Sequence, residues 1–173
     1  TVPRSSGFNS LEVANMTDAS TLVTIILMFI GGGSLSTAGG IKVGTFIIVI
    51  LSVITFLRRS EELRVFNHSV SKTTSFKAFA VLSITAILIF SGLFTLLILE
   101  PNKDFLDLLF EAVSAACTVG LSRGITSELQ PASLFALILL MFAARLGPLT
   151  LAYLIATPKK SRLKHPPADI QIG

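Results

Sequence analysis

Residues 105–122 read FLDLLFEAVSAACTVGLS, and this stretch decides the fold. Its first part, residues 105–117, is an apolar run that contains Asp107 and Glu111. As an α-helix this run would be roughly 20 Å long, whereas the hydrocarbon core of a bilayer is about 30 Å thick. The run therefore predicts a re-entrant helix of half length or an interfacial helix, followed by a glycine-containing turn at residues 118–122.

The segments on both sides of this stretch are long enough to cross a membrane, which takes about 20 apolar residues in a helix. Residues 78–99 contain no charge, and residues 132–156 contain one, Arg145. Of the 14 Lys and Arg residues, five lie in 58–77 and four in 157–173, so the positive-inside rule places both segments in the cytoplasm. The helix at 78–99 then runs outward, the helix at 132–156 runs inward, and the short helix enters from outside.

The composition of the whole chain agrees with a lipid environment. Apolar residues make up 51% and charged residues 14%, against about 25% charged residues in soluble domains, and the mean hydropathy is +0.78. These values exclude a disordered chain and disfavour a soluble domain. One cysteine and two histidines exclude an internal disulfide and a Cys/His zinc site. The sequence has no nucleophile–base pair or phosphate loop, and its basic clusters are topology signals, so it predicts neither an enzyme nor a nucleic-acid-binding protein.

A glycine-rich segment interrupts a further apolar stretch, residues 21–57. Residues 31–44 read GGGSLSTAGGIKVG and hold six of the 12 glycines. Glycine costs about 1 kcal/mol per residue in a helix relative to alanine, so this segment should break the helix. Irregular backbone at membrane depth persists only where it is packed in protein or lines a watery cavity. The stretch therefore predicts one broken span with an unwound loop facing a pore or cleft, or alternatively a helix kink that allows close packing.

An internal repeat connects these segments and aligns position 18 with position 131. Residues 18–29 and 131–142 are identical at six of 12 positions, and Ser5 and Gly7 fall on Thr118 and Gly120 without a gap. We therefore expect an all-α integral membrane fold of repeated membrane helix–pore helix–filter–membrane helix units. Residues 1–57 would be the end of one unit, 58–77 a cytoplasmic loop, 78–156 a whole unit, and 157–173 a cytoplasmic tail.

The turns that occupy equivalent positions in the repeat are candidate cation sites. The C-terminal end of the short helix carries about half a negative charge at the membrane centre, and successive backbone carbonyls can replace the hydration shell of K⁺. Glycine permits the backbone angles that aligned carbonyls require. One turn cannot encircle an ion, so a ring needs about four units. The predicted filter residues are Ser5, Ser6, Gly7, Phe8, Thr118, Val119, Gly120 and Leu121; the alternative is plain extracellular loops.

Four motifs in order, RSSGFN at 4–9, GGSLSTAGGIK at 32–42, TVGLS at 118–122 and RLGPLT at 145–150, resemble the Trk/Ktr/HKT superfamily of potassium transporters. The likeness is strongest to the membrane subunit of bacterial Ktr systems. It implies four units around a pseudo-fourfold pore in one polypeptide, of which this chain would be the end of the third and the whole fourth. It further implies K⁺ as the transported ion, without a covalent cofactor, and a bacterial plasma membrane location with a cytoplasmic C-terminus. Ala144 departs from the glycine that is frequent there in the family.

The resemblance also assigns a gate. It implies that the loop at 31–44 obstructs the path below the filter, and that Arg145 faces the pore beside it. The alternative for Arg145 is a structural pair with Glu111 or with a loop carbonyl, and Lys42 could simply extend toward the cytoplasm. The predicted gate residues are Gly31, Gly32, Gly33, Ser34, Ser36, Thr37, Gly39, Gly40, Lys42, Gly44 and Arg145.

The resemblance implies two protein partners besides the lipid bilayer: a second copy of the membrane subunit, and a cytoplasmic ring of nucleotide-binding regulatory subunits that controls the gate. The leading functional hypothesis is therefore the pore-forming subunit of a potassium uptake system. A non-conducting membrane scaffold and a sodium-conducting relative are the alternatives. Both visible filter turns contain a glycine, which favours K⁺.

Overall fold

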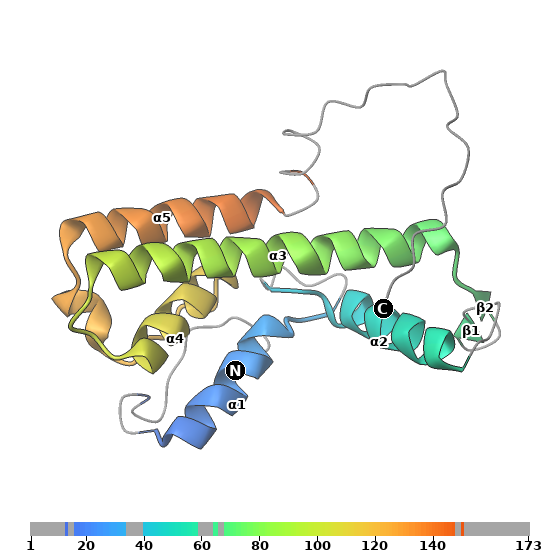
Figure 1. Cartoon of the computed structure of the whole chain (residues 1–173), viewed down its shortest axis with the longest axis horizontal. Coiled ribbons are helices and arrows are strands. Elements are labelled where there is room, and N and C mark those ends of the chain that lie inside the picture. The colour runs from blue at the N-terminus through green and yellow to red at the C-terminus, as the bar shows by residue number, and fades with distance from the viewer. Residues whose placement is uncertain are drawn as a thin grey trace.

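The computed structural model describes residue 13 and residues 16–33, 40–58, 64–65, 68–147 and 150, and this part is mostly helical (Figure 1). In chain order its elements are α1 Asp18–Phe29, α2 Val43–Leu57, β1 Arg64–Val65, β2 His68–Ser69, α3 Lys72–Leu99, α4 Phe105–Ala116, the 3-10 helix η3 Ile125–Glu128 and α5 Pro131–Leu146. β1 and β2 form a two-residue antiparallel pair that the all-α expectation missed.

α3 is the longest helix of the described part and runs along the long axis of the molecule (Figure 1). Thr73–Leu99 is the one helical stretch of the described part that is long and apolar enough to cross a membrane by itself. The helix begins at Lys72, six residues before the span predicted at 78–99, because the side chain of Ser71 caps it by accepting a hydrogen bond from the Thr74 N–H at 3.2 Å. The segment predicted as a cytoplasmic loop, 58–77, therefore contains the first turn of α3.

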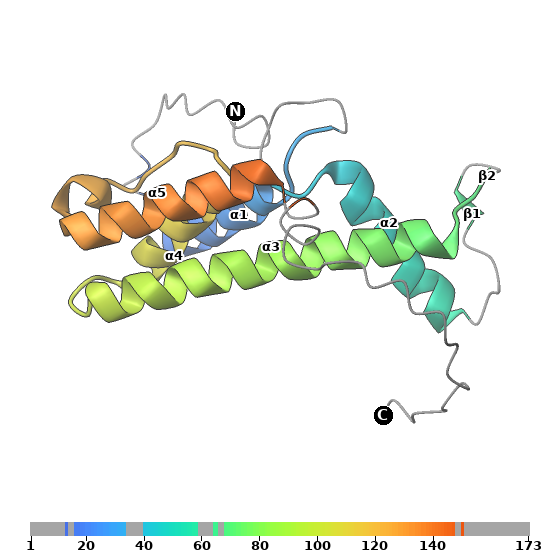
Figure 2. The ribbon, with the colours of Figure 1, turned by 90° about the horizontal axis from the view of Figure 1, so that it is seen from above.

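α4 packs against both α3 and α5, which also contact each other, and it contacts α1 as well (Figures 1 and 2). It begins near the end of α3, and its last residue, Ala116, lines a cavity of about 30 Å³ together with Thr85 and Leu88 from the middle of α3. The short helix predicted at 105–117 is thus present and extends only halfway along its neighbour. Most of its length is buried, and its apolar residues contribute to a core shared with α1, α3 and α5. The buried residues of α4 are Leu108, Phe110, Glu111, Ala112, Val113, Ser114, Ala115 and Ala116.

α1 and α2 are separate helices, and the residues between them include most of the glycine-rich segment predicted to break the span. Between them Ile30 and Ile41 form a parallel β-bridge, in which the Gly31 N–H donates to the Ile41 carbonyl and the Ile41 N–H donates to the Phe29 carbonyl, at 2.9 and 3.0 Å. Parallel pairing means that the chain runs in the same direction on both sides of the intervening loop. We call residues 29–32 and 41–43 the neck of this loop.

α5 is shorter than the span predicted at 132–156. It ends at Leu146, where Gly147 has φ +86° and its N–H donates to the Ala144 carbonyl. Pro148 follows in the sequence and could not provide the next helical hydrogen bond. The span predicted at 132–156 is therefore interrupted at Gly147, whereas Thr150 is again helical. Residues 148–149 and 151–156 lie outside the described residues. α1 and α5 begin at positions 18 and 131, the two positions that the sequence repeat aligns.

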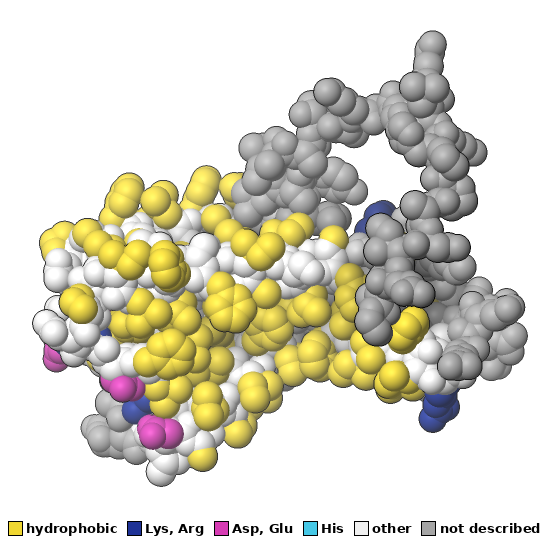
Figure 3. Space-filling view, viewed as in Figure 1, with side chains coloured by type: hydrophobic (Ala, Val, Ile, Leu, Met, Phe, Trp, Pro, Cys, Tyr) yellow, Lys and Arg dark blue, Asp and Glu magenta, His cyan; other side chains and the backbone are white. Residues whose placement is uncertain are grey.

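The outer faces of α3 and α5 are apolar, and charged side chains lie toward the ends of the molecule (Figure 3). Large side chains such as Phe90, Phe94, Phe135 and Phe142 are exposed over most of their area. A soluble monomer rarely exposes contiguous apolar surface of this extent, whereas lipid or further helices would cover it in a membrane.

Candidate functional site

The turn after α4 has an unusual backbone. Helix α4 is closed by the Cys117 N–H, which donates to the Val113 carbonyl at 2.8 Å. Thr118 then adopts φ +50° and Gly120 φ +81°. The left-handed region costs a residue with a Cβ about 1–2 kcal/mol but is open to glycine. Thr118 is the one non-glycine residue with positive φ in the described part, and strained backbone of this kind clusters at functional sites.

Hydrogen bonds to Ser114 determine which way the peptide groups of the turn point. The Val119 N–H donates to the Ser114 carbonyl at 2.9 Å, and the Leu121 N–H donates to the Ser114 Oγ at 3.1 Å. In a trans peptide the carbonyl points opposite to the N–H that follows it, and the described chain has no cis peptide. The carbonyls of Thr118 and Gly120 therefore point away from α4, toward the side on which Gly120 is exposed.

The carbonyl of Leu121 behaves differently. It accepts a hydrogen bond from the Ser114 hydroxyl at 2.5 Å, so it points toward α4. The side chains of Val119 and Leu121 are buried in the hydrophobic core. Of the four residues predicted for this filter turn, Thr118 and Gly120 thus present their carbonyls outward, while Leu121 does not.

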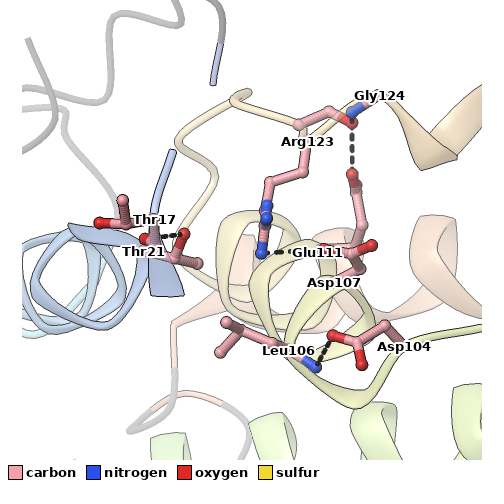
Figure 4. A network of polar contacts seen from close by, with 9 residues as sticks. Thr17, Thr21, Asp104, Leu106, Asp107, Glu111, Arg123 and Gly124 are labelled. Atoms are coloured by element: carbon pink, nitrogen blue, oxygen red, sulfur yellow. Dashed lines mark hydrogen bonds and ion pairs between the residues drawn. The ribbon is translucent and has the colours of Figure 1, made fainter. Parts of the chain in front are cut away.

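A second group of polar contacts ties the chain after the turn to α4 (Figure 4). The Ser122 hydroxyl donates to Glu111 and accepts from the Gly124 N–H at 2.9 Å. Arg123 forms an ion pair with Asp107, with 2.9 Å between Nη1 and Oδ1. Glu111 thus ties the chain after the turn to α4. The spacing of Asp107, Glu111 and Ser114 places all three on one face of α4. This periodicity marks a polar face of the helix but does not specify which residues Ser114 contacts.

Gly40, which adjoins the neck of the loop, lies near the end of α4. Gly40 and Ala144 line the small cavity that also contains Ala116, so the loop base, the end of α4 and the C-terminal part of α5 meet there. Arg145 follows Ala144 in the last turn of α5. The other predicted gate residues within the described part, Gly31, Gly32, Gly33, Lys42 and Gly44, belong to the neck or adjoin it. Outside the described residues lie Ser5, Ser6, Gly7, Phe8, Ser34, Ser36, Thr37 and Gly39.

Glu100, which the sequence reasoning did not single out, joins the end of α3 to the start of α5. Its carboxylate accepts hydrogen bonds from the Gln130 N–H and the Ser133 hydroxyl, both at 2.7 Å. The bond from the Gln130 backbone and then that from Ser133 lower the pKa of Glu100 below its ordinary value of 4.5. The contact therefore fixes the start of α5 against the end of α3.

The lowered pKa of Glu100 predicts a pH-dependent stability. Its ionised form stabilises the folded state fully above pH about 4.5, and this contribution is lost as the pH falls through the lower folded-state pKa. We expect Glu100→Gln to lower the melting temperature of the detergent-solubilised protein at pH 7, and the difference from wild type to shrink below pH about 4.5. A difference that is independent of pH would contradict this role of the charge.

Comparison with known proteins identifies the class. Residues 1–164 match the TrkH family, described as cation transport proteins. The chain belongs to this family, as its four motifs indicated.

Particular relatives narrow the class further. The chain is 41% identical over 171 residues to Ktr system potassium uptake protein B of Bacillus subtilis (strain 168). The aligned region covers 99% of this chain and 38% of that protein. The chain is 38% identical over 170 residues to the protein of the same name from Vibrio alginolyticus, covering 98% and 37%. Potassium/sodium uptake protein NtpJ of Enterococcus hirae is 28% identical over 177 residues, covering 99% and 39%. The chain spans less than two fifths of the length of these relatives.

Proposed function

We propose that this chain supplies part of the ion path of a potassium uptake system, with the turn at 118–121 as one quarter of its selectivity filter. The observation that carries this proposal is the orientation of the Thr118 and Gly120 carbonyls away from α4 at the C-terminal end of a half-length helix. Partial negative charge from the helix end and outward carbonyl oxygens together favour a dehydrated cation. The names of the relatives favour K⁺ as that cation.

Unequal burial of repeated residues supports a ring of such units. In α1, Met28 is 1% exposed, and it belongs to the core that α4 dominates. The corresponding residues of α5 are much more exposed. Met141, the equivalent of Met28, is 44% exposed, and Phe142, the equivalent of Phe29, is 64% exposed. Because the same residues on α1 pack beside a pore helix, the exposed face of α5 fits the pore helix of a further unit. Successive units joined in this way would close around a pseudo-fourfold axis.

The gate belongs to the same proposal. The neck of the loop meets the end of α4 at mid-α3, so the loop at 31–44 can act as a barrier directly below the filter. Arg145 would add a positive charge to that barrier. Control by a cytoplasmic ring of nucleotide-binding subunits and assembly as a homodimer in a bacterial plasma membrane, with the C-terminus in the cytoplasm, complete the proposal.

The role of Arg145 can be tested by removing its charge. A positive charge beside a cation path raises the barrier, and lowering that barrier by about 1 kcal/mol would raise the flux about fivefold. We therefore expect Arg145→Ala to retain the melting temperature and to increase basal rubidium flux, most visibly without regulatory subunits. A less stable protein with reduced flux would instead identify Arg145 as a structural residue.

The function itself is tested by ion flux through the complete purified transporter in liposomes. We expect an outward K⁺ gradient to drive flux, and an equal Na⁺ gradient to drive much less. Comparable Na⁺ and K⁺ flux would favour a sodium-conducting relative. Correctly inserted protein without any cation flux, with and without regulatory subunits, would favour the non-conducting scaffold.

A further inference from the structure

One side chain of α4 makes contacts with two successive peptide groups of the turn. The Ser114 Oγ accepts from the Leu121 N–H at 3.1 Å and donates to the Leu121 carbonyl at 2.5 Å. The N–H belongs to the peptide group that joins residues 120 and 121, and the carbonyl belongs to the next one. Ser114 is itself buried, so water does not compete for these bonds.

We propose that Ser114 is a positioning residue for ion selectivity that turns the Leu121 carbonyl out of the ion path, so that the carbonyls facing the ion end at Gly120. The inference rests on the proposed function of the turn as a filter. The bond to the Leu121 N–H directs the preceding Gly120 carbonyl away from α4, whereas the bond to the Leu121 carbonyl directs that oxygen toward α4. A single hydroxyl can do both because it has one donor and two acceptor lone pairs.

Hydrogen bonds of the next residue, Ser122, also fix the orientation of the Leu121 carbonyl. Ser122 donates to Glu111, which lies three residues before Ser114 on the same face of α4. The Ser122 hydroxyl also accepts from the Thr126 hydroxyl at 2.8 Å and from the Gly124 N–H at 2.9 Å. Rotation of the peptide group between Leu121 and Ser122 toward the ion path would therefore disturb both contacts with α4.

Loss of the Ser114 hydroxyl changes the number of carbonyls available to an ion. Without it the Leu121 carbonyl has no partner on α4 among the described contacts, and a buried unpaired carbonyl is costly. The carbonyl then gains by rotating toward a bound cation. An additional, loosely held oxygen at the outer end coordinates Na⁺ and K⁺ with less discrimination, because selectivity depends on the number and the rigidity of the coordinating carbonyls.

The test compares three serine variants of the complete transporter in liposomes. Ser114→Ala removes the hydroxyl, Ser114→Thr retains it, and Ser91→Ala removes a hydroxyl that is exposed on α3 and bonded only to the Leu88 carbonyl in the described part. We expect the ratio of K⁺ to Na⁺ permeability to fall about tenfold in Ser114→Ala. The ratio should remain near the wild-type value in Ser114→Thr and be unchanged in Ser91→Ala.

Each other result has a defined meaning. A folded, conducting Ser114→Ala protein with the wild-type ratio would overturn the inference, as would a loss of selectivity in Ser114→Thr, which would indicate side-chain volume. A Ser114→Ala protein that does not assemble would show a folding role and also overturn it. Absence of flux in the unmodified transporter would instead refute the proposed function.

Discussion

Replacing Gly120 by serine is expected to lower the K⁺ to Na⁺ permeability ratio of the complete transporter about tenfold or more while it still assembles. Gly120 has φ +81°, and a residue with a Cβ costs about 1–2 kcal/mol there. The strain is relieved if the backbone rotates, and this rotation would move the Gly120 carbonyl from its outward direction. A change of about 1.4 kcal/mol in relative ion binding corresponds to a tenfold change in the ratio. Competition between Rb⁺ and Na⁺ uptake in liposomes measures it.

Gly147→Ser is the matched control for this substitution. Gly147 has φ +86° and follows the last residue of α5, so serine introduces comparable backbone strain outside the turn. Its melting temperature should fall by an amount similar to that of Gly120→Ser, but its selectivity should remain unchanged. Equal selectivity of the two variants, or wild-type selectivity in Gly120→Ser, would show that Gly120 is not part of the filter.

The half-length helix and the equivalent starting positions of α1 and α5 could be predicted because they depend on patterns in the sequence itself. The apolar run at 105–117 is too short to cross a membrane, and α4 covers nearly the same residues, Phe105–Ala116. The repeat likewise aligns the first residues of α1 and α5, since Pro131 suits a first helical position and the residues that follow are shared. Backbone length and residue type alone determine such features.

The ends of the two long helices are harder to predict. The charge of Lys77 is typical of a loop, but the first turns of a helix can carry a lysine when its charged group reaches beyond the lipid. The apolar residues after Gly147 indicate a continued span, although the positive φ of Gly147 and the proline after it end the helix. Apolar composition indicates depth in the membrane but not continuity of the helix.

The contacts of Ser114 and Glu100 could not be predicted from composition or spacing alone. Their partners lie too far away in the sequence for a local pattern to indicate them. Ser114 contacts a residue seven positions away, and Glu100 contacts residues 30 and 33 positions away. Their roles depend on the packing of α4 between α3 and α5. A serine in the middle of a helix is more often bonded to its own helix, as Ser52 is to the Ile48 carbonyl.

Replacing Gly40 by alanine should disrupt the neck of the loop. Gly40 has φ +76°, and a Cβ there would lie 2.8 Å from the Met28 carbonyl oxygen and 3.1 Å from that of Phe29. Both atoms are backbone at the end of α1, and the Phe29 carbonyl accepts the hydrogen bond from the Ile41 N–H. A shift of this backbone would therefore disturb the neck. Left-handed strain of about 1–2 kcal/mol and overpacking of about 1–3 kcal/mol together predict a loss of roughly 2–5 kcal/mol in stability.

The same substitution shows whether the neck controls the ion path. Gly33→Ala is its matched control, because a Cβ on Gly33 has no atom within 4 Å and its φ is not in the left-handed range. If the loop is a barrier held by its neck, Gly40→Ala should melt earlier and conduct Rb⁺ without the regulatory subunits, whereas Gly33→Ala should match wild type in both measurements. Because opening the neck relieves the clash, basal flux and lost stability should appear together in one preparation. An unstable Gly40→Ala protein that still needs its regulatory subunits to conduct would show that the loop is a structural kink and not a gate.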